Sequence, residues 1–275
     1  MTAEYQSTGE SETYTGIGTV PKMTNVTHDV LQVSPLYVFS QTIVNDVWKS
    51  AFNVPRAYYE DEKLGQLQPR IQELGLEAAR HPGELVFGLV ISNPLAFDGV
   101  ALIADTRVIG TSANIDNQIA GGSDPTVVAN FQLQLAAARG TMRKFQDEFG
   151  RPLNRPGNVI MVPAELESVA YQALNAQTTY LNQAVVPAGA TGFFNASQYT
   201  VVVNPYLTDV NDWYLIYSSG ASSPFIYQTR ISPDFEPLAQ GSLPAIVNDE
   251  FVFTVRARYN VGVGDPRFIV KITNT

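Results

Sequence analysis

The chain has 275 residues, of which 45% are hydrophobic and 16% charged, a composition typical of a soluble globular protein with one large or two intertwined domains. It contains no cysteine, so disulfides, thiolate metal sites and cysteine nucleophiles are excluded. Its 26 acidic and 17 basic residues give a formal charge of -9, which disfavours tight nucleic-acid binding because such binding needs Lys and Arg to displace counterions from phosphates.

The first twenty residues, MTAEYQSTGESETYTGIGTV, lack the basic start and apolar stretch of a signal peptide. No run in the chain approaches the ~18 apolar residues of a membrane span. We therefore expect no membrane association, and a protein used in a cytoplasm or in something assembled there. Residues 1 to about 25 are rich in Thr, Ser, Gly and Glu, which predicts an extended arm that is disordered or laid across a neighbour.

From Val30 the chain becomes more apolar, and the spacing of Val38, Ile43, Val47 and Phe52 predicts an amphipathic helix or a helix followed by a strand. The next stretch, NVPRAYYEDEKLGQLQ, has no periodicity and predicts an exposed loop or hairpin.

The segment PRIQELGLEAARHPGELVFGLV predicts a helix that begins at Pro69. Pro82 removes one helical hydrogen bond and clashes with the preceding turn. The helical spacing nevertheless resumes beyond it, at Leu85, Val86, Leu89 and Val90. We therefore expect a long kinked helix or two helices in series.

The strongest periodicity follows the sequence GGSDP, at Val128, Phe131, Leu135, Ala138, Met142, Phe145 and Phe149. Asp124 and Pro125 act as start signals and Gly150 as a stop signal, so an amphipathic helix packed on a sheet is predicted. NVIMVP then predicts a buried strand, and AELESVAYQALNAQ a further helix.

The last third carries β-branched and aromatic runs separated by Pro, Gly, Asn and Asp, which predict strands at YTVVVNP, DWYLIYSS, PFIYQT, EFVFTVRARY and RFIVKI. Residues 178–198 have little pattern and predict a surface loop. Helices early in the chain and strands late predict an α+β fold.

Gly262 and Gly264, in YNVGVGDPRFIVKI, raise the possibility of a phosphate-binding loop. Such a loop must open a helix, because the helix N-terminus and its free N–H groups hold the phosphate. Here a proline and a strand follow, so we expect a turn joining two antiparallel strands instead.

The candidates for catalysis are few. The two histidines, His28 and His81, have no nucleophile motif such as GxSxG near them, although either could in principle join a Ser-His-Asp triad with distant residues. The acidic run Glu60, Asp61 and Glu62 lacks the glycine and distal glutamate of a calcium loop, and Asp249 with Glu250 lies beside a strand start. We therefore expect no enzymatic activity, no catalytic residue, no metal and no cofactor.

Several stretches in a fixed order resemble the major head subunit (major capsid protein) family of Mu-like phages. They are PRIQELGLEAARHPGELVFGLV, FDGVALIAD, VIMVPAELESVAYQALNA, WYLIYSSGASSPFIYQTR and ARYNVGVG. The resemblance covers the chain from about Ala57 to the end, and its most specific part is PFIYQTR followed by ARYNVGVG. The family often has an aromatic residue where this chain has Val263, which leaves open whether that position is a surface turn or a contact with the next subunit.

The resemblance implies the tailed-phage major capsid fold. Residues 1–30 would be an N-terminal arm, and residues 31–124 would hold an extended loop, near 54–68, and a peripheral domain with a spine helix. Residues 125–220 would be the axial domain, and residues 221–275 would return to the peripheral domain as strands beside the spine helix.

The resemblance also implies a function without turnover. Copies of the chain would form hexamers and pentamers of an icosahedral shell that encloses double-stranded DNA without reading its sequence, with portal, scaffold and decoration proteins as further partners. Two alternatives stay open: an encapsulin-like bacterial compartment, and a hydrolase or binding protein of unrelated fold. Some capsid proteins of this fold crosslink through a lysine and an asparagine, and Lys63 lies in the extended-loop candidate, although an ordinary solvated lysine is the simpler interpretation.

Overall fold

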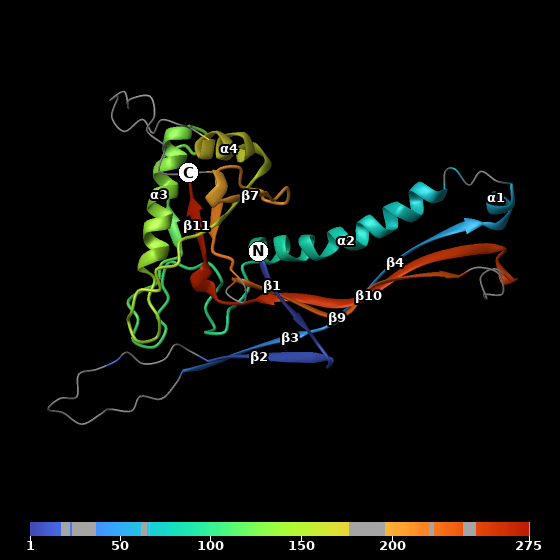
Figure 1. Ribbon diagram of the computed structural model, residues 1–275, viewed down its shortest axis with the longest axis horizontal. Coiled ribbons are helices and arrows are strands. Elements are labelled where there is room, and N and C mark those ends of the chain that lie inside the picture. The colour runs from blue at the N-terminus through green and yellow to red at the C-terminus, as the bar shows by residue number, and fades with distance from the viewer. Residues whose placement is uncertain are drawn as a thin grey trace.

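The computed structural model describes residues 1–17, 23, 37–61, 65, 67–175, 196–219, 223–238 and 246–274. These residues form a compact lobe at one end of the molecule and an elongated lobe that extends away from it, with a two-stranded hairpin lying beside both (Figure 1). Helices and strands occur in both lobes, so the predicted α+β class is confirmed.

The elongated lobe is built on a four-stranded sheet of order β1-β9-β10-β4, whose strands are Thr2–Gln6, Phe225–Leu238, Glu250–Val263 and Asp46–Pro55. β10 is antiparallel to both of its neighbours, whereas β1 is parallel to β9. The pairing of β10 with β9 is irregular around Arg256 and Tyr259. The predicted strands at PFIYQT and EFVFTVRARY are therefore confirmed, and they are the two longest strands described.

Helix α2, Leu67–Ser92, runs along one face of this sheet (Figure 1). It is one continuous helix of 26 residues, about 39 Å long at the usual rise, with Pro82 inside it. Its buried residues are Leu74, Val86 and Val90. The predicted helix is confirmed, and the alternative of two helices in series is wrong. A short helix α1, Arg56–Glu60, lies in the preceding stretch that was expected to be a loop or hairpin.

The hairpin consists of β2, Ser11–Ile17, and β3, Val38–Val44, paired antiparallel (Figure 1). The N-terminal residues therefore have partners within their own chain, because β1 pairs with β9 and β2 pairs with β3. The helix predicted between Val38 and Phe52 is wrong, because β3 and β4 cover that stretch. Side chains in β3 alternate between more and less exposed, which is the period of a strand.

The compact lobe is built on a five-stranded sheet of order β5-β11-β8-β6-β7, whose strands are Gln118–Ala120, Ile269–Thr273, Trp213–Ile216, Val159–Val162 and Thr200–Val203. Helices α3, Val128–Lys144, and α4, Glu167–Asn175, pack against one face. The end of α2 packs against the other face in a second apolar cluster. Because both faces are covered, all four residues of β6 and of β8 are buried.

Helix α3 confirms the predicted amphipathic helix but ends earlier than expected. Asp124 accepts hydrogen bonds from the backbone and hydroxyl of Thr126, which fixes the turn before the helix. The helix ends at Lys144, and Phe145 has left the helical conformation while its ring still packs in the core. Gly150 is therefore not the helix stop, although its φ of 76° places it in a later turn.

The C-terminal strands do not form the predicted hairpin. β10 belongs to the elongated sheet, whereas β11 pairs with β8 and β5 in the compact sheet. The connection between them includes the 3-10 turn η4, Pro266–Phe268. The resemblance places β11 beside α2, but only its first residue, Ile269, packs in the cluster that contains the end of α2. Two further 3-10 turns, η2 and η3, are Ala164–Leu166 and Ala196–Gln198, and the loop expected at 178–198 lies mostly outside the described residues.

Candidate assembly surfaces

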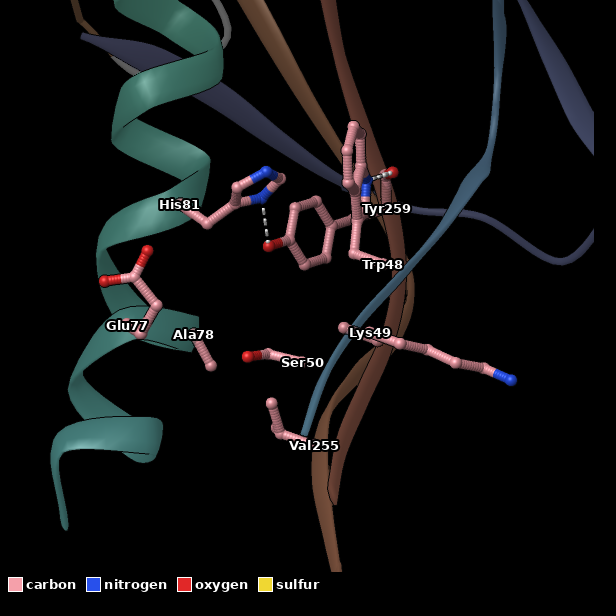
Figure 2. Close-up of a pocket in the computed structure, with 9 residues that line it drawn as sticks. Trp48, Lys49, Ser50, Glu77, Ala78, His81, Val255 and Tyr259 are labelled. Carbon is pink, nitrogen blue, oxygen red and sulfur yellow. Dashed lines mark hydrogen bonds between the residues drawn. The ribbon is translucent and has the colours of Figure 1, made fainter. Parts of the chain in front are cut away.

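His81 lies in a cavity of about 260 Å³ between α2 and the elongated sheet. Its Nδ1 is 2.8 Å from the hydroxyl of Tyr259, and its ring centroid is 4.3 Å from that of Trp48. The indole Nε1 of Trp48 in turn donates to the backbone oxygen of Tyr259 at 2.9 Å. Figure 2 shows the imidazole directed from α2 toward Tyr259.

The cavity also contains Ser50 and Glu77, which could suggest a hydrolytic triad with His81. Among the residues that line the cavity, His81 forms its hydrogen bond with Tyr259. The side chain of Ser50 is directed toward Ala78 of the helix (Figure 2). A triad needs the base within hydrogen-bond reach of the nucleophile. In the described residues His81 therefore joins helix to sheet and does not activate Ser50. His28, the other candidate, lies outside the described residues.

Glu60, Asp249 and Glu250 contact neighbouring side chains at the far end of the elongated lobe. Glu60 pairs with Arg56 at 2.6 Å, and Asp249 lies 3.9 Å from the same guanidinium. Glu250 accepts a hydrogen bond from Asn53 at 2.8 Å across the strand pair. Glu62 and Lys63 lie outside the described residues, so the crosslinking hypothesis stays a prediction. Where the chain is described, there is no cluster of three metal-ligating side chains.

Gly262 and Gly264 permit close packing rather than a turn. Gly262 lies within β10, and a Cβ there would come 2.4 Å from Cδ1 of Ile43, which packs on that face of the sheet. A Cβ at Gly264 would come 2.6 Å from the backbone oxygen of Ser223. Val263 between them is 2% exposed, so it is neither a surface turn nor a contact with another subunit. Neither glycine opens a helix long enough to hold a phosphate.

The connection between the two sheets contains a buried ionic group that sequence reasoning did not identify. Arg267 donates to Asp265 and, through Nη1, to Glu148 at 2.8 Å, and the side chains of Arg267 and Glu148 are 9% and 0% exposed. Burial acts to lower the pKa of Arg267, but the two carboxylates outweigh it and raise that pKa. The sequence signal was Asp265-Pro266-Arg267 directly after the glycines, in which Asp265 caps the 3-10 turn.

Two features of the elongated lobe suit contact with other molecules. The hairpin of β2 and β3 packs on the compact lobe through Phe39 and on the elongated sheet through Ile43, but its Val38 and Val44 are 63% and 51% exposed. Strand β4 is an edge of its sheet over ten residues, paired only with β10. Unpaired strand edges and exposed apolar side chains are common places for protein association. No helix in the described part of the chain has the length and apolar character needed to cross a bilayer.

Three comparisons with known proteins agree with this geometry. Residues 57–272 match the family model described as phage capsid protein. The Mu-like prophage FluMu major head subunit of Haemophilus influenzae is 22% identical over 262 residues, covering 94% of this chain and 60% of that protein. The chain therefore spans about 60% of the length of this curated relative.

Solved structures share the fold. The procapsid of bacteriophage JBD30 aligns over 100% of this chain and 66% of its own, with a TM-score of 0.55 and 21% identity. The capsid structure of cyanophage P-SCSP1u aligns over 100% of this chain and 86% of its own, with a TM-score of 0.62 and 10% identity. The similarity thus extends over both lobes and is a similarity of fold. Because the family model matches residues 57–272, which are most of the chain, the chain belongs to the phage capsid protein family.

Proposed function

We propose that this chain is a major capsid protein, whose copies form hexamers and pentamers of an icosahedral phage shell around double-stranded DNA. The observation that carries the proposal is the family match over residues 57–272 together with a fold shared with phage capsids from end to end. Closed rings of five and six need contacts between different surfaces of neighbouring copies. An elongated molecule with exposed apolar side chains on its hairpin and a free strand edge provides such surfaces.

The shell would be held by many weak contacts, because summed contacts between tethered copies give high stability while single ones can still be corrected during assembly. Residues 1–30 are proposed as the arm and residues near 54–68 as the extended loop. The peripheral domain would comprise the rest of 31–124 with the strands of 221–275, and residues 125–220 would form the axial domain. The hairpin of β2 and β3 crosses the boundary at residue 30, which supports a joint role for both segments in reaching a neighbour.

The protein would act in the virion after assembly in the host cytoplasm, with portal, scaffold and decoration proteins as partners and without catalytic turnover. The formal charge of -9 suits enclosure of DNA without sequence-specific binding.

Sizing and negative-stain imaging of the purified chain test the proposal. Rings of five or six copies or hollow shells of megadalton mass are expected, whereas a persistent monomer of 30.0 kDa at high concentration contradicts it. Packaged phage DNA inside particles made during infection supports a virion protein, and a cargo enzyme inside them would indicate a bacterial compartment instead.

A further inference from the structure

Three cations lie together on the face of the elongated sheet that α2 does not cover. Trp48, Ser50, Val255, Ala257 and Tyr259 line the cavity beneath α2, and Lys49 borders it with its amine directed away (Figure 2). Because successive side chains of a strand point to opposite faces, the residues between them point away from the helix. These are Lys49, Arg256 and Arg258, which we call the cationic cluster. Figure 2 shows Lys49 directed away from His81 and α2.

The cationic cluster is an unfavourable arrangement in a single copy. Lys49 of β4 and Arg256 of β10 are direct partners in the strand register, and Arg258 follows two residues later on the same face. Like charges directly opposite each other on neighbouring strands are destabilising. In the chain as described, none of the three forms an ion pair.

Two further observations show that the positive charge is uncompensated. The Nε of Arg258 is buried and has no hydrogen-bond partner, which is costly for a charged group. Asp234 of β9 is the register partner of Arg256, but it is exposed, and among the described residues it forms no ion pair with Arg256. An anion from outside the subunit would supply the missing partner through charge-assisted hydrogen bonds.

We propose that the cationic cluster binds an acidic surface of a second copy of this chain. The proposal rests on the proposed function and names one surface through which the shell is assembled. The chain carries a formal charge of -9, with 26 acidic and 17 basic residues, so a second copy offers an excess of carboxylates to a cationic group. Val47, the register partner of Arg258, is 49% exposed beside the cluster, and a mixed apolar and cationic face suits a protein partner better than phosphates.

A second copy also explains why such a cluster persists. A group of like charges that costs stability in the free subunit is retained when it has a role in the assembled state. Stability of the subunit and assembly should therefore respond in opposite directions to the same substitution. A cluster that served the fold alone could not produce that pattern.

The test is Lys49→Glu in the full chain, which replaces the like-charge pair with an opposite-charge pair to Arg256. We expect the unfolding temperature of the subunit to rise, while the concentration needed for shell or ring formation rises about ten-fold or more. Lys49→Gln should give an intermediate result in both measurements. Lys144→Glu, which makes the same charge change at the exposed end of α3, is the matched control and should leave assembly unchanged.

Three outcomes overturn the inference. If the unmodified chain forms shells and the Lys49→Glu variant forms them at the same concentration, the cluster is not an assembly contact, although the proposed function stands. If the unmodified chain never assembles, both fail. If a short DNA duplex binds the unmodified subunit in fluorescence polarisation, and Lys49→Glu abolishes that binding, the partner is nucleic acid and not a second copy.

Discussion

The imidazole Nδ1 of His81 lies 2.8 Å from the hydroxyl of Tyr259, which joins the middle of α2 to the central strand β10. Burial, the neighbouring Tyr227 and the charge of Glu84 raise the pKa of Tyr259 to about 12, so the phenol keeps its proton over the physiological range. The contact is partly buried, and therefore it should contribute to holding helix and sheet together.

Tyr259→Phe should lower the free energy of unfolding by about 1 kcal/mol, because it removes one hydrogen bond while keeping the ring. Urea denaturation of the unassembled subunit measures this. Tyr5→Phe is the control, since Tyr5 is 39% exposed. Equal stability of the two variants would show that the bond between His81 and Tyr259 contributes nothing.

Gly262→Ala should destabilise the subunit by about 1–3 kcal/mol, because a Cβ at this position would come 2.4 Å from Cδ1 of the buried Ile43. Combining it with Ile43→Ala, which removes the clashing atoms, should cost less than the sum of the two single changes. Gly75→Ala in α2 is the control, because a Cβ there meets nothing within 4 Å, and it should be neutral or slightly stabilising. Additive costs of the two substitutions would contradict the close approach.

Arg267→Met should lower the free energy of unfolding by about 3–5 kcal/mol, because it removes the buried cation that pairs with the fully buried carboxylate of Glu148 and with Asp265. Arg70→Met removes an exposed ion pair with Glu73, whose side chains are 70% and 65% exposed, and should cost at most about 0.5 kcal/mol. Thermal unfolding of both variants gives the comparison. Similar losses in the two would mean that the connection between the sheets does not depend on the buried pair.

Acid should weaken the junction between β1 and β2. The backbone N–H groups of Thr8 and Gly9 and the hydroxyl of Ser7 donate to Glu12 at 2.9, 3.0 and 3.0 Å, which lowers the pKa of Glu12 below its ordinary value of 4.5. A lowered pKa in the folded state means that this contribution to stability is complete above the ordinary value and is lost as the pH falls through the folded value.

Glu12→Gln should therefore remove this part of the pH dependence while leaving the rest of the acid unfolding curve in place. Unfolding free energies of the unmodified and variant subunits between about pH 3 and pH 6 measure it. An NMR titration of the Glu12 carboxyl carbon gives the direct check. A midpoint at or above 4.5 would contradict the hydrogen bonding described for this carboxylate.

Local patterns predicted the individual elements of the chain well where one periodicity dominated. The apolar spacing from Val128 to Met142 predicted a helix correctly because it has a clear helical period, and the short apolar run Val159–Val162 predicted a buried strand correctly because every residue in it is apolar. The stretch from Val38 to Phe52 was predicted wrongly, since its few apolar residues fit both a helix and a strand and only pairing with β2 and β10 selects the strand.

For the candidate site residues as well, the sequence predicted local features and did not predict contacts between residues far apart in the chain. The sequence excluded cysteine chemistry and a phosphate loop, but it could not show that His81 meets Tyr259, which is 178 residues away, or that Arg267 meets Glu148, which is 119 residues away. The like-charge pair of Lys49 and Arg256 was also hidden, because the two residues become neighbours only through strand register.

The sequence by itself determined the class of the protein, its long helix, the strands of its last third and, through the order of several motifs, its resemblance to the capsid family. Only the tertiary structure decided that β10 and β11 belong to different sheets and that Gly262 accommodates Ile43. The physical reason is that helical and strand periods depend on residues a few positions apart. Sheet partners, buried ion pairs and close backbone contacts depend instead on segments that meet only after the chain has folded.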